Sequence, residues 1–102
     1  MLYVYRFHAD CGRSGSLDGM FVCSESGKAT LEKLIADETH VHFGEVLGKH
    51  SDIGGSIEED EITLVDASQD DIAAMLRVFG LTGVDDWYTI SGYNPLDYVG
   101  QE

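Results

Sequence analysis

The sequence predicts an α+β fold, with a two-layer, mostly antiparallel sheet of about five strands and two helices on one face, in the order ββαββαβ. The first residues alternate in the two-residue period of a strand, and residues 68–80 repeat apolar side chains at helical spacing. The other apolar segments are short and are separated by stretches rich in Gly, Ser and Asp, which favours strands joined by hairpins. Because the chain has 102 residues, we expect residues 1–102 to form one domain around a single core.

The N-terminal segment predicts a β-hairpin. Residues 2–8, with the sequence LYVYRFH, are rich in strand-forming residues and alternate between two faces. Residues 9–18 contain two glycines and two serines, which is typical of a loop. A second, short strand is expected at residues 20–23, antiparallel to the first. The predicted inward face of the first strand consists of Tyr3, Tyr5 and Phe7.

A first helix is expected to follow this hairpin. The hydroxyl of Ser24 or Ser26 can accept a hydrogen bond from a backbone N–H of the first turn and so cap the helix. The helix is expected to end near Glu38. The side chains on its inner face are Leu31, Leu34 and Ile35.

The middle of the chain predicts two more strands. Residues 40–47 form the third strand, in which alternate side chains point to opposite faces. Residues 48–56 contain three glycines and are expected to form a long flexible connection. Residues 61–65 form the fourth strand. The predicted inward residues are Val41, Phe43, Ile62 and Leu64, and the predicted outward residues are His40, His42 and Thr63.

The second helix gives the clearest amphipathic pattern in the chain. Ser68 can cap it, and acidic residues in its first turn complement the helix dipole. Gly80, which can take a left-handed conformation, ends it. A fifth strand is expected at residues 87–90, followed by a turn at 92–95 that returns the chain to the core. The apolar face of the helix consists of Ile72, Met75, Leu76 and Phe79.

The strongest global feature is the negative charge. Nineteen acidic residues against six basic residues give a net charge of −13. Residues 1–50 carry seven acids and five bases, a net of −2, whereas residues 51–102 carry twelve acids and one base, a net of −11. Such a field repels nucleic acid and anionic lipid and attracts basic partners. We therefore expect neither direct nucleic-acid binding nor membrane binding.

The apolar segments and the cysteine content of the sequence favour a cytoplasmic location. No apolar stretch reaches the roughly 20 residues that span a bilayer, and the N-terminus does not show the pattern of a signal peptide. Two cysteines are fewer than a secreted disulfide framework of this size usually contains. We expect a cytoplasmic protein in which both thiols are reduced, with Cys23 buried and Cys11 in a loop.

An acidic run near the centre of the chain predicts the binding surface. In one interpretation its carboxylates imitate a phosphate backbone and occupy a basic surface of another protein, as in an inhibitor of a nucleic-acid enzyme of the sort that mobile elements encode. In the other, they serve solubility or adaptation to high salt. Our preferred hypothesis is a non-enzymatic inhibitor or regulator without a cofactor, and the second interpretation stays open. The residues assigned to the acidic surface are Glu58, Glu59, Asp60, Glu61, Asp70 and Asp71.

An alternative hypothesis is a small metal- or thiol-dependent enzyme. His40 and His42 point to the same side of their strand, and His8 would join them in a Zn²⁺ site if the first and third strands were neighbours. Cys11, three residues after His8, is a candidate nucleophile because a nearby base can produce the reactive thiolate. No established ligand or catalytic motif accompanies these four residues.

The C-terminal segment contains aromatic residues of the kind that are enriched at protein interfaces. Tyr93 is a candidate anchor for a partner, whereas Trp87 and Tyr98 are expected to close the core. A further alternative is an accessory subunit with an acidic or salt-adapted surface. Such a subunit could pair through an exposed sheet edge and form a homo-oligomer.

Overall fold

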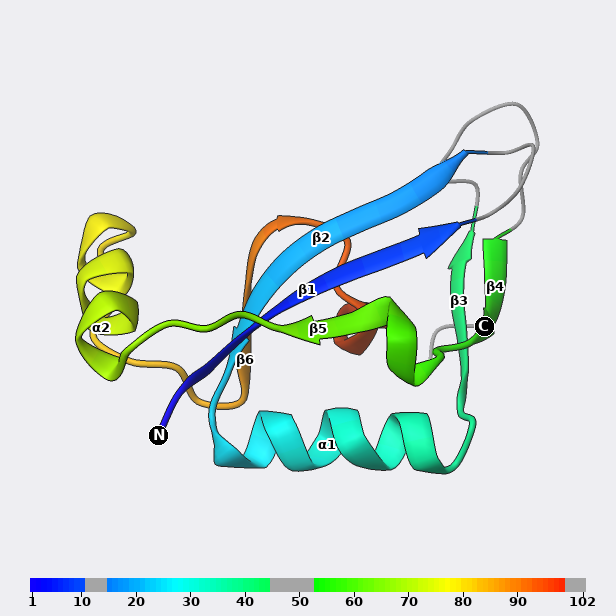
Figure 1. The fold of residues 1–102 in the computed structure, drawn as a ribbon, viewed down its shortest axis with the longest axis horizontal. Helices are drawn as coiled ribbons and strands as arrows, with labels where there is room; N and C mark the ends of the chain where they lie inside the picture. The colour runs from blue at the N-terminus through cyan, green and yellow to red at the C-terminus, as the bar shows by residue number, and fades with distance from the viewer. Residues whose placement is uncertain (11–14, 45–52, 99–102) are drawn as a thin grey trace.

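The computed structural model describes residues 1–10, 15–44 and 53–98. It confirms the α+β class and the mostly antiparallel sheet (Figure 1). In chain order the described elements are β1 (Tyr3–Asp10), β2 (Ser16–Cys23), α1 (Glu25–Ala36), β3 (His40–Gly44), β4 (Ile53–Ser56), the 3₁₀ helix η2 (Glu59–Glu61), β5 (Ile62–Leu64), α2 (Gln69–Val78), β6 (Trp87–Gly92) and the 3₁₀ helix η3 (Pro95–Tyr98).

The main sheet has the strand order β5-β1-β2-β6, and each neighbouring pair is antiparallel. β1 and β2 form its centre, where Tyr5 lies opposite Phe21. β5 extends the sheet beside β1, with Ile62 opposite Phe7, and β6 extends it beside β2. The two longest strands therefore carry half of the buried hydrophobic residues in the described part of the chain, and two shorter strands form the edges.

The central hairpin is longer than the sequence predicted. Ala9 pairs with Leu17 and Asp10 pairs with Ser16, so both ends of the expected loop at residues 9–18 belong to β1 and β2. Ala9 and Leu17 are both buried, and they continue the inward face of the hairpin. The free energy gained by burying these side chains is larger than the preference of the segment's glycines and serines for a loop.

The two helices pack against different sides of the main sheet, which corrects the prediction of two layers with both helices on one face. Leu31 of α1 belongs to the same core cluster as Phe21, whereas Ile72 of α2 packs in a second cluster with Val22. Phe21, Val22 and Cys23 are consecutive and fully buried, so β2 is covered on both faces. A continuous apolar run of this kind indicates a strand buried on both sides.

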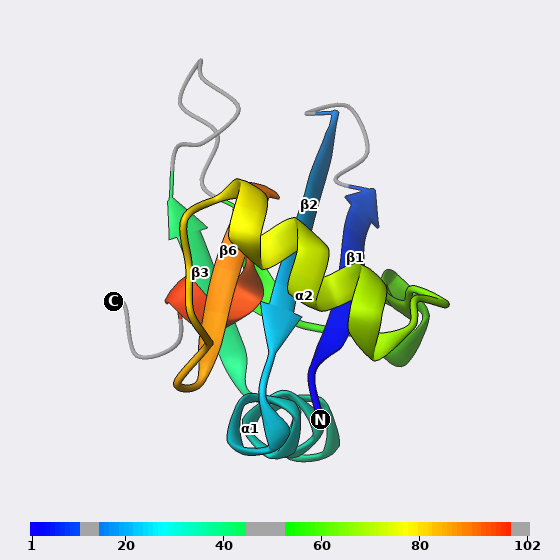
Figure 2. The ribbon, with the colours of Figure 1, turned by 90° about the vertical axis from the view of Figure 1, so that its left-hand side faces the viewer.

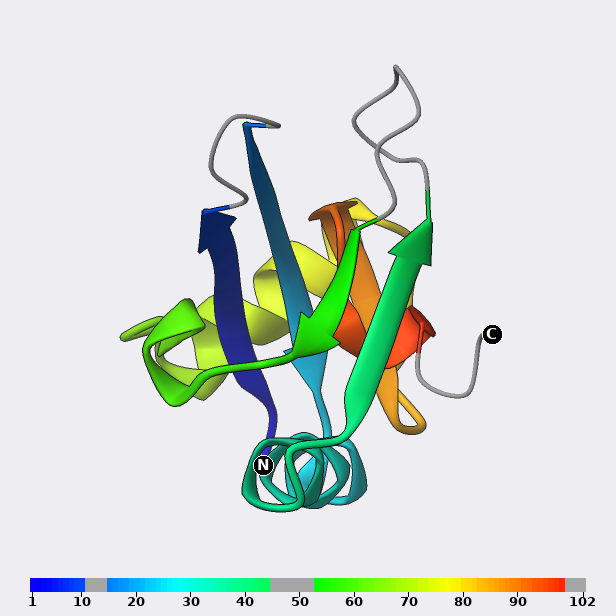
Figure 3. The same ribbon diagram turned by 90° about the vertical axis from the view of Figure 1, so that its right-hand side faces the viewer.

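Two opposite views show how the faces are covered. α2 lies in front of the main sheet in Figure 2. From the other side, β3 and β4 lie in front of the sheet, and α1 crosses one end of its strands (Figure 3). The protein therefore has three layers, formed by α2, the main sheet and the β3–β4 sheet.

The β3–β4 sheet was only half predicted. β3 is a strand as expected, with Val41 and Phe43 buried against the core. The expected flexible connection at residues 48–56 is wrong at its C-terminal end, because residues 53–56 form β4 and pair with β3. Gly54 and Gly55 lie in β4, and two adjacent glycines favour the prediction of a loop rather than a strand. Residues 45–52 lie outside the described part of the chain.

The second half of the chain follows its predicted boundaries closely. Ser68 Oγ accepts a hydrogen bond of 3.1 Å from the backbone N–H of Asp71 and caps α2, and Gly80 has a φ of +75° just after the helix. Leu64 was expected to point inward, but it is 57 % exposed because β5 is a three-residue edge strand. Neither described helix is long and apolar enough to cross a membrane.

Candidate functional site

The acidic run at residues 58–61 has a fixed conformation between two strands. Ile57 is buried just before it, and β5 begins at Ile62 just after it. Glu61 Oε1 accepts a hydrogen bond of 2.8 Å from the backbone N–H of Glu58, which closes the turn that leads into η2. The other side chains of the run are exposed, and that of Glu61 is half-buried. The turn therefore presents carboxylates to solvent from an ordered backbone.

The end of β1 adds a further acid to this turn. Because β5 pairs with β1, η2 lies beside the C-terminal part of β1 (Figure 1). Asp10 alternates outward there, as does His8. A depression of about 320 Å³ between these elements is lined by His8, Asp10, Glu58, Asp60 and Glu61. We call Asp10, Glu58, Glu59, Asp60 and Glu61 the η2 patch.

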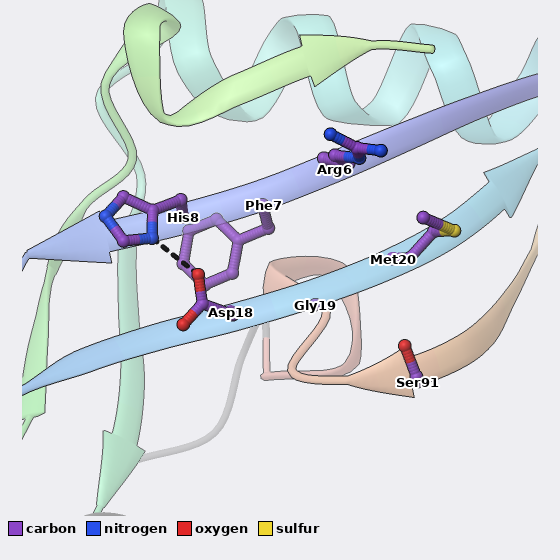
Figure 4. A pocket seen from close by; sticks show the side chains of 7 residues that line it. All are labelled: Arg6, Phe7, His8, Asp18, Gly19, Met20 and Ser91. Carbon is purple, nitrogen blue, oxygen red and sulfur yellow. Dashed lines mark hydrogen bonds and ion pairs between the residues drawn. The ribbon is translucent and has the colours of Figure 1, made fainter.

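A histidine–aspartate pair borders the η2 patch. His8 lies directly opposite Asp18 in the β1–β2 pairing, and His8 Nδ1 is 2.5 Å from Asp18 Oδ1 (Figure 4). The hydrogen bond to Asp18 raises the pKa of His8, and the negative charges of Asp18, Asp10 and Glu61 raise it further. The same hydrogen bond lowers the pKa of Asp18. Ser16 Oγ donates a second, longer hydrogen bond of 3.3 Å to the Asp18 carboxylate.

A second depression lies on the other side of this pair, on the part of the sheet that α2 leaves open. Its volume is about 400 Å³, and Arg6, His8, Met20 and Ser91 contribute side chains to its lining (Figure 4). The sequence did not predict this surface, because residues 9–18 were expected to be a loop. Once β1 and β2 are known to pair over their full length, their two-residue alternation places His8 and Asp18 on the same face.

Most of the predicted acidic surface forms no ion pair within the described part of the chain. Within the described residues, Lys28 pairs with Glu32 at 3.1 Å, and the N-terminal amine pairs weakly with Glu25 at 3.9 Å. None of the four acids at residues 58–61 forms an ion pair with a described cationic group. Among the described groups, protonated His8 interacts with the charge of Glu61 without forming an ion pair with it, and the rest of the run is open to a cation from another molecule.

Asp70 and Asp71 belong to a different place on the molecule. They begin α2, which lies at the opposite end of β5 from η2 (Figure 1). Asp71 also has a structural role, since its carboxylate accepts a hydrogen bond of 3.3 Å from the backbone N–H of Ser68 in a reciprocal capping box. The six residues assigned to one acidic surface are thus divided between two sites.

Tyr93 lies at the edge of the core rather than free on the surface. It is half-buried, and its ring meets Phe43 edge-on at a centroid distance of 6.2 Å. Trp87 is also half-buried, and its Nε1–H donates a hydrogen bond of 2.8 Å to Asp97. The second carboxylate oxygen of Asp97 accepts from Thr89 Oγ1 at 2.5 Å, so Asp97 joins β6 to η3.

The structure separates the residues of the predicted metal- or thiol-dependent site. His8 is in β1 of the main sheet, whereas His40 and His42 are in β3 and pair only with β4 among the described strands. Residues 1–10, 15–44 and 53–98 contain no group of three or more His, Cys, Asp or Glu side chains placed to hold a metal ion. Cys11 lies outside the described residues.

Comparisons with protein families, characterised proteins and solved structures gave no match to this chain.

Proposed function

We propose that this protein is a non-enzymatic, cytoplasmic binding protein, an inhibitor or regulator, and that the η2 patch engages a basic surface of another protein. The observation that supports this proposal is a run of four consecutive acidic residues on an ordered turn, none of which forms an ion pair with a described cationic group.

Physical chemistry favours a basic partner for such a patch. Like charges held close together repel one another, and an incoming cationic surface relieves that repulsion while steering the two molecules together. Because the backbone of the turn is already ordered, binding loses less conformational entropy than it would in a flexible acidic tail. The most specific form of this proposal is an inhibitor that competes with nucleic acid for the basic channel of a nucleic-acid enzyme.

Charge reversal at the patch tests the proposal. The variant combines Glu58→Lys, Glu59→Lys and Asp60→Lys, and it keeps Glu61 because that side chain closes the turn. A matched control combines Asp37→Lys, Glu38→Lys and Asp66→Lys. Each variant replaces three acids by lysines, so the two variants have the same net charge. The three control residues are exposed and form no described ion pair.

The measurement is affinity capture from native lysate at low salt, followed by release in a salt gradient. Wild type and control are expected to capture the same basic protein, which the patch variant fails to capture. Capture of that protein by the patch variant would contradict the proposal. Equal loss in both variants would show that total charge, and not the patch, determines binding.

A further inference from the structure

The β3–β4 sheet carries two histidines on its outer side. His40 and His42 are alternate residues of β3, and Val41 between them is fully buried. Phe43 is also buried, and its ring centroid lies 5.8 Å from that of Phe7 in the main sheet. The inward face of β3 therefore anchors the strand and fixes the direction in which the two imidazoles leave it.

The two imidazole rings lie side by side above a glycine. Their centroids are 6.4 Å apart, and their planes differ by 20°. Gly54 lies opposite His42 in β4, and a Cβ atom on Gly54 would approach Cε1 of His40 and Cδ2 of His42 to 3.1 Å each. The missing side chain leaves the space that the rings occupy. His40 is exposed and His42 is partly exposed, so a hydrated ion can reach this face.

Two imidazoles on one face of a strand are suited to chelation. Imidazole binds Cu²⁺, Ni²⁺ and Zn²⁺, and a Zn–N bond is about 2.0–2.1 Å long. At that bond length, adjacent coordination positions place the ring centroids roughly 4.5–5 Å apart, so rotation of the side chains has to bring the rings about 1.5 Å closer. Each ring can bind through one nitrogen while the other keeps a hydrogen bond.

We propose that His40 and His42 form a two-histidine site for a divalent transition-metal ion, with Cu²⁺ bound most tightly. The order follows the general preference of nitrogen ligands for Cu²⁺ over Ni²⁺ and Zn²⁺. Residues 1–10, 15–44 and 53–98 place no third His, Cys, Asp or Glu side chain with the pair, so the ion has two ligands from the described part of the chain. The net charge of −13 raises the local concentration of cations around the molecule. The site does not involve His8 and is independent of the η2 patch.

Calorimetric titration of the full chain with CuCl₂, NiCl₂ and ZnCl₂ near neutral pH tests this site. One ion per chain is expected, and either His40→Gln or His42→Gln should weaken Cu²⁺ binding at least about tenfold, because each imidazole supplies one of the two protein ligands. The matched control is His8→Gln, which removes a histidine from the main sheet and should leave the affinity unchanged. Circular dichroism verifies that all three variants fold.

A second readout locates the ion. In NMR spectra, Zn²⁺ should shift the imidazole resonances of His40 and His42 together and leave those of His8 in place. Wild-type affinity in either single variant, an equal loss in His8→Gln, or a dissociation constant above about 1 mM would overturn the proposal, since 1 mM corresponds to weak, non-chelating contact.

Discussion

His8 and Asp18 face each other across the β1–β2 hairpin, and a hydrogen bond of 2.5 Å joins His8 Nδ1 to Asp18 Oδ1. This pair places a titratable cation at the border of the η2 patch, where His8 lines the same depression as Asp10 and Glu61. The protonation of one side chain is therefore linked both to the stability of the hairpin and to the charge of the proposed binding surface.

The stability contributed by this pair should depend on pH. The pKa of His8 is raised in the folded state, so its contribution is complete below the unfolded pKa of about 6.5 and is lost as the pH rises through the folded pKa. The pKa of Asp18 is lowered, so its contribution is present above the unfolded pKa of about 3.9 and is lost as the pH falls through the folded pKa. Between these limits His8→Gln should be most destabilising.

Urea unfolding at about pH 5.5, below the unfolded histidine pKa of about 6.5, and at about pH 8.5, well above it, measures this effect. The difference in unfolding free energy between wild type and His8→Gln is expected to be larger at the lower pH. In an Asp18→Asn background the pH dependence of that difference should shrink. An equal difference at both pH values would contradict the role of the pair.

Replacement by alanine should destabilise the protein more at Leu17 than at Leu64, which is the opposite of what the sequence alone suggests. Leu17 was assigned to a loop but is fully buried, whereas Leu64 was expected to point inward but is 57 % exposed. Leu17→Ala should cost about 2–5 kcal/mol of unfolding free energy because it leaves a cavity. Leu64→Ala should cost less than about 1 kcal/mol. Chemical denaturation of both variants checks the order, and a larger loss for Leu64→Ala would argue against the paired hairpin.

Gly19 should not tolerate a side chain. A Cβ atom on Gly19 would lie 1.8 Å from the carbonyl oxygen of Tyr93, at the point where Gly19 pairs with Gly92 of β6. Gly19→Ala should therefore lower the unfolding free energy by about 1–3 kcal/mol or more, because the backbone of β6 has to move. Gly83 provides a control, since a Cβ atom there meets nothing within 4 Å. Equal stability of Gly19→Ala and Gly83→Ala would refute the close approach of β2 and residue 93.

The thiol of Cys23 should be unreactive in the native protein. Cys23 is fully buried, and burial raises the pKa of its thiol to about 12. Because the thiolate is the reacting species, iodoacetamide should label Cys23 slowly at pH near 8 and rapidly in urea. Peptide-resolved mass spectrometry separates this label from that on Cys11. Rapid labelling of Cys23 in the native state would show that this part of the core is accessible.

Local patterns in the sequence predicted several elements closely. The cap at Ser68, the apolar spacing of Ile72 and Leu76 and the stop at Gly80 define α2. In β1, the alternation placed Tyr5 and Phe7 correctly in the core, but Val4 on the face expected to point outward is also buried, because it packs in the cluster that includes α2. These features depend on residues that are close in the sequence, so a single sequence is sufficient to predict them.

Features that depend on distant contacts were missed. The strand at residues 53–56 contains two glycines and exists because it pairs with β3, so its composition alone favours a loop. The placement of α1 and α2 on different sides follows from burial of both faces of β2, which the run Phe21, Val22 and Cys23 could have indicated.

The acidic site was predicted only in part. The run at residues 58–61 was identified by its composition, but the neighbouring position of Asp10 follows from the β1–β5 register and not from the sequence. η2 and the acids Asp70 and Asp71 lie beyond opposite ends of β5, although Asp70 is only nine positions after Glu61 in the sequence.

The most direct test of the central claim is the salt dependence of binding, measured with the purified partner that wild type captures. If the η2 patch makes the contact, the affinity of wild type and of the Asp37/Glu38/Asp66 lysine control should fall steeply with rising salt. The Glu58/Glu59/Asp60 lysine variant should bind at least about tenfold more weakly at low salt and should show a much shallower slope. The same affinity and slope in the patch variant as in wild type would contradict the account.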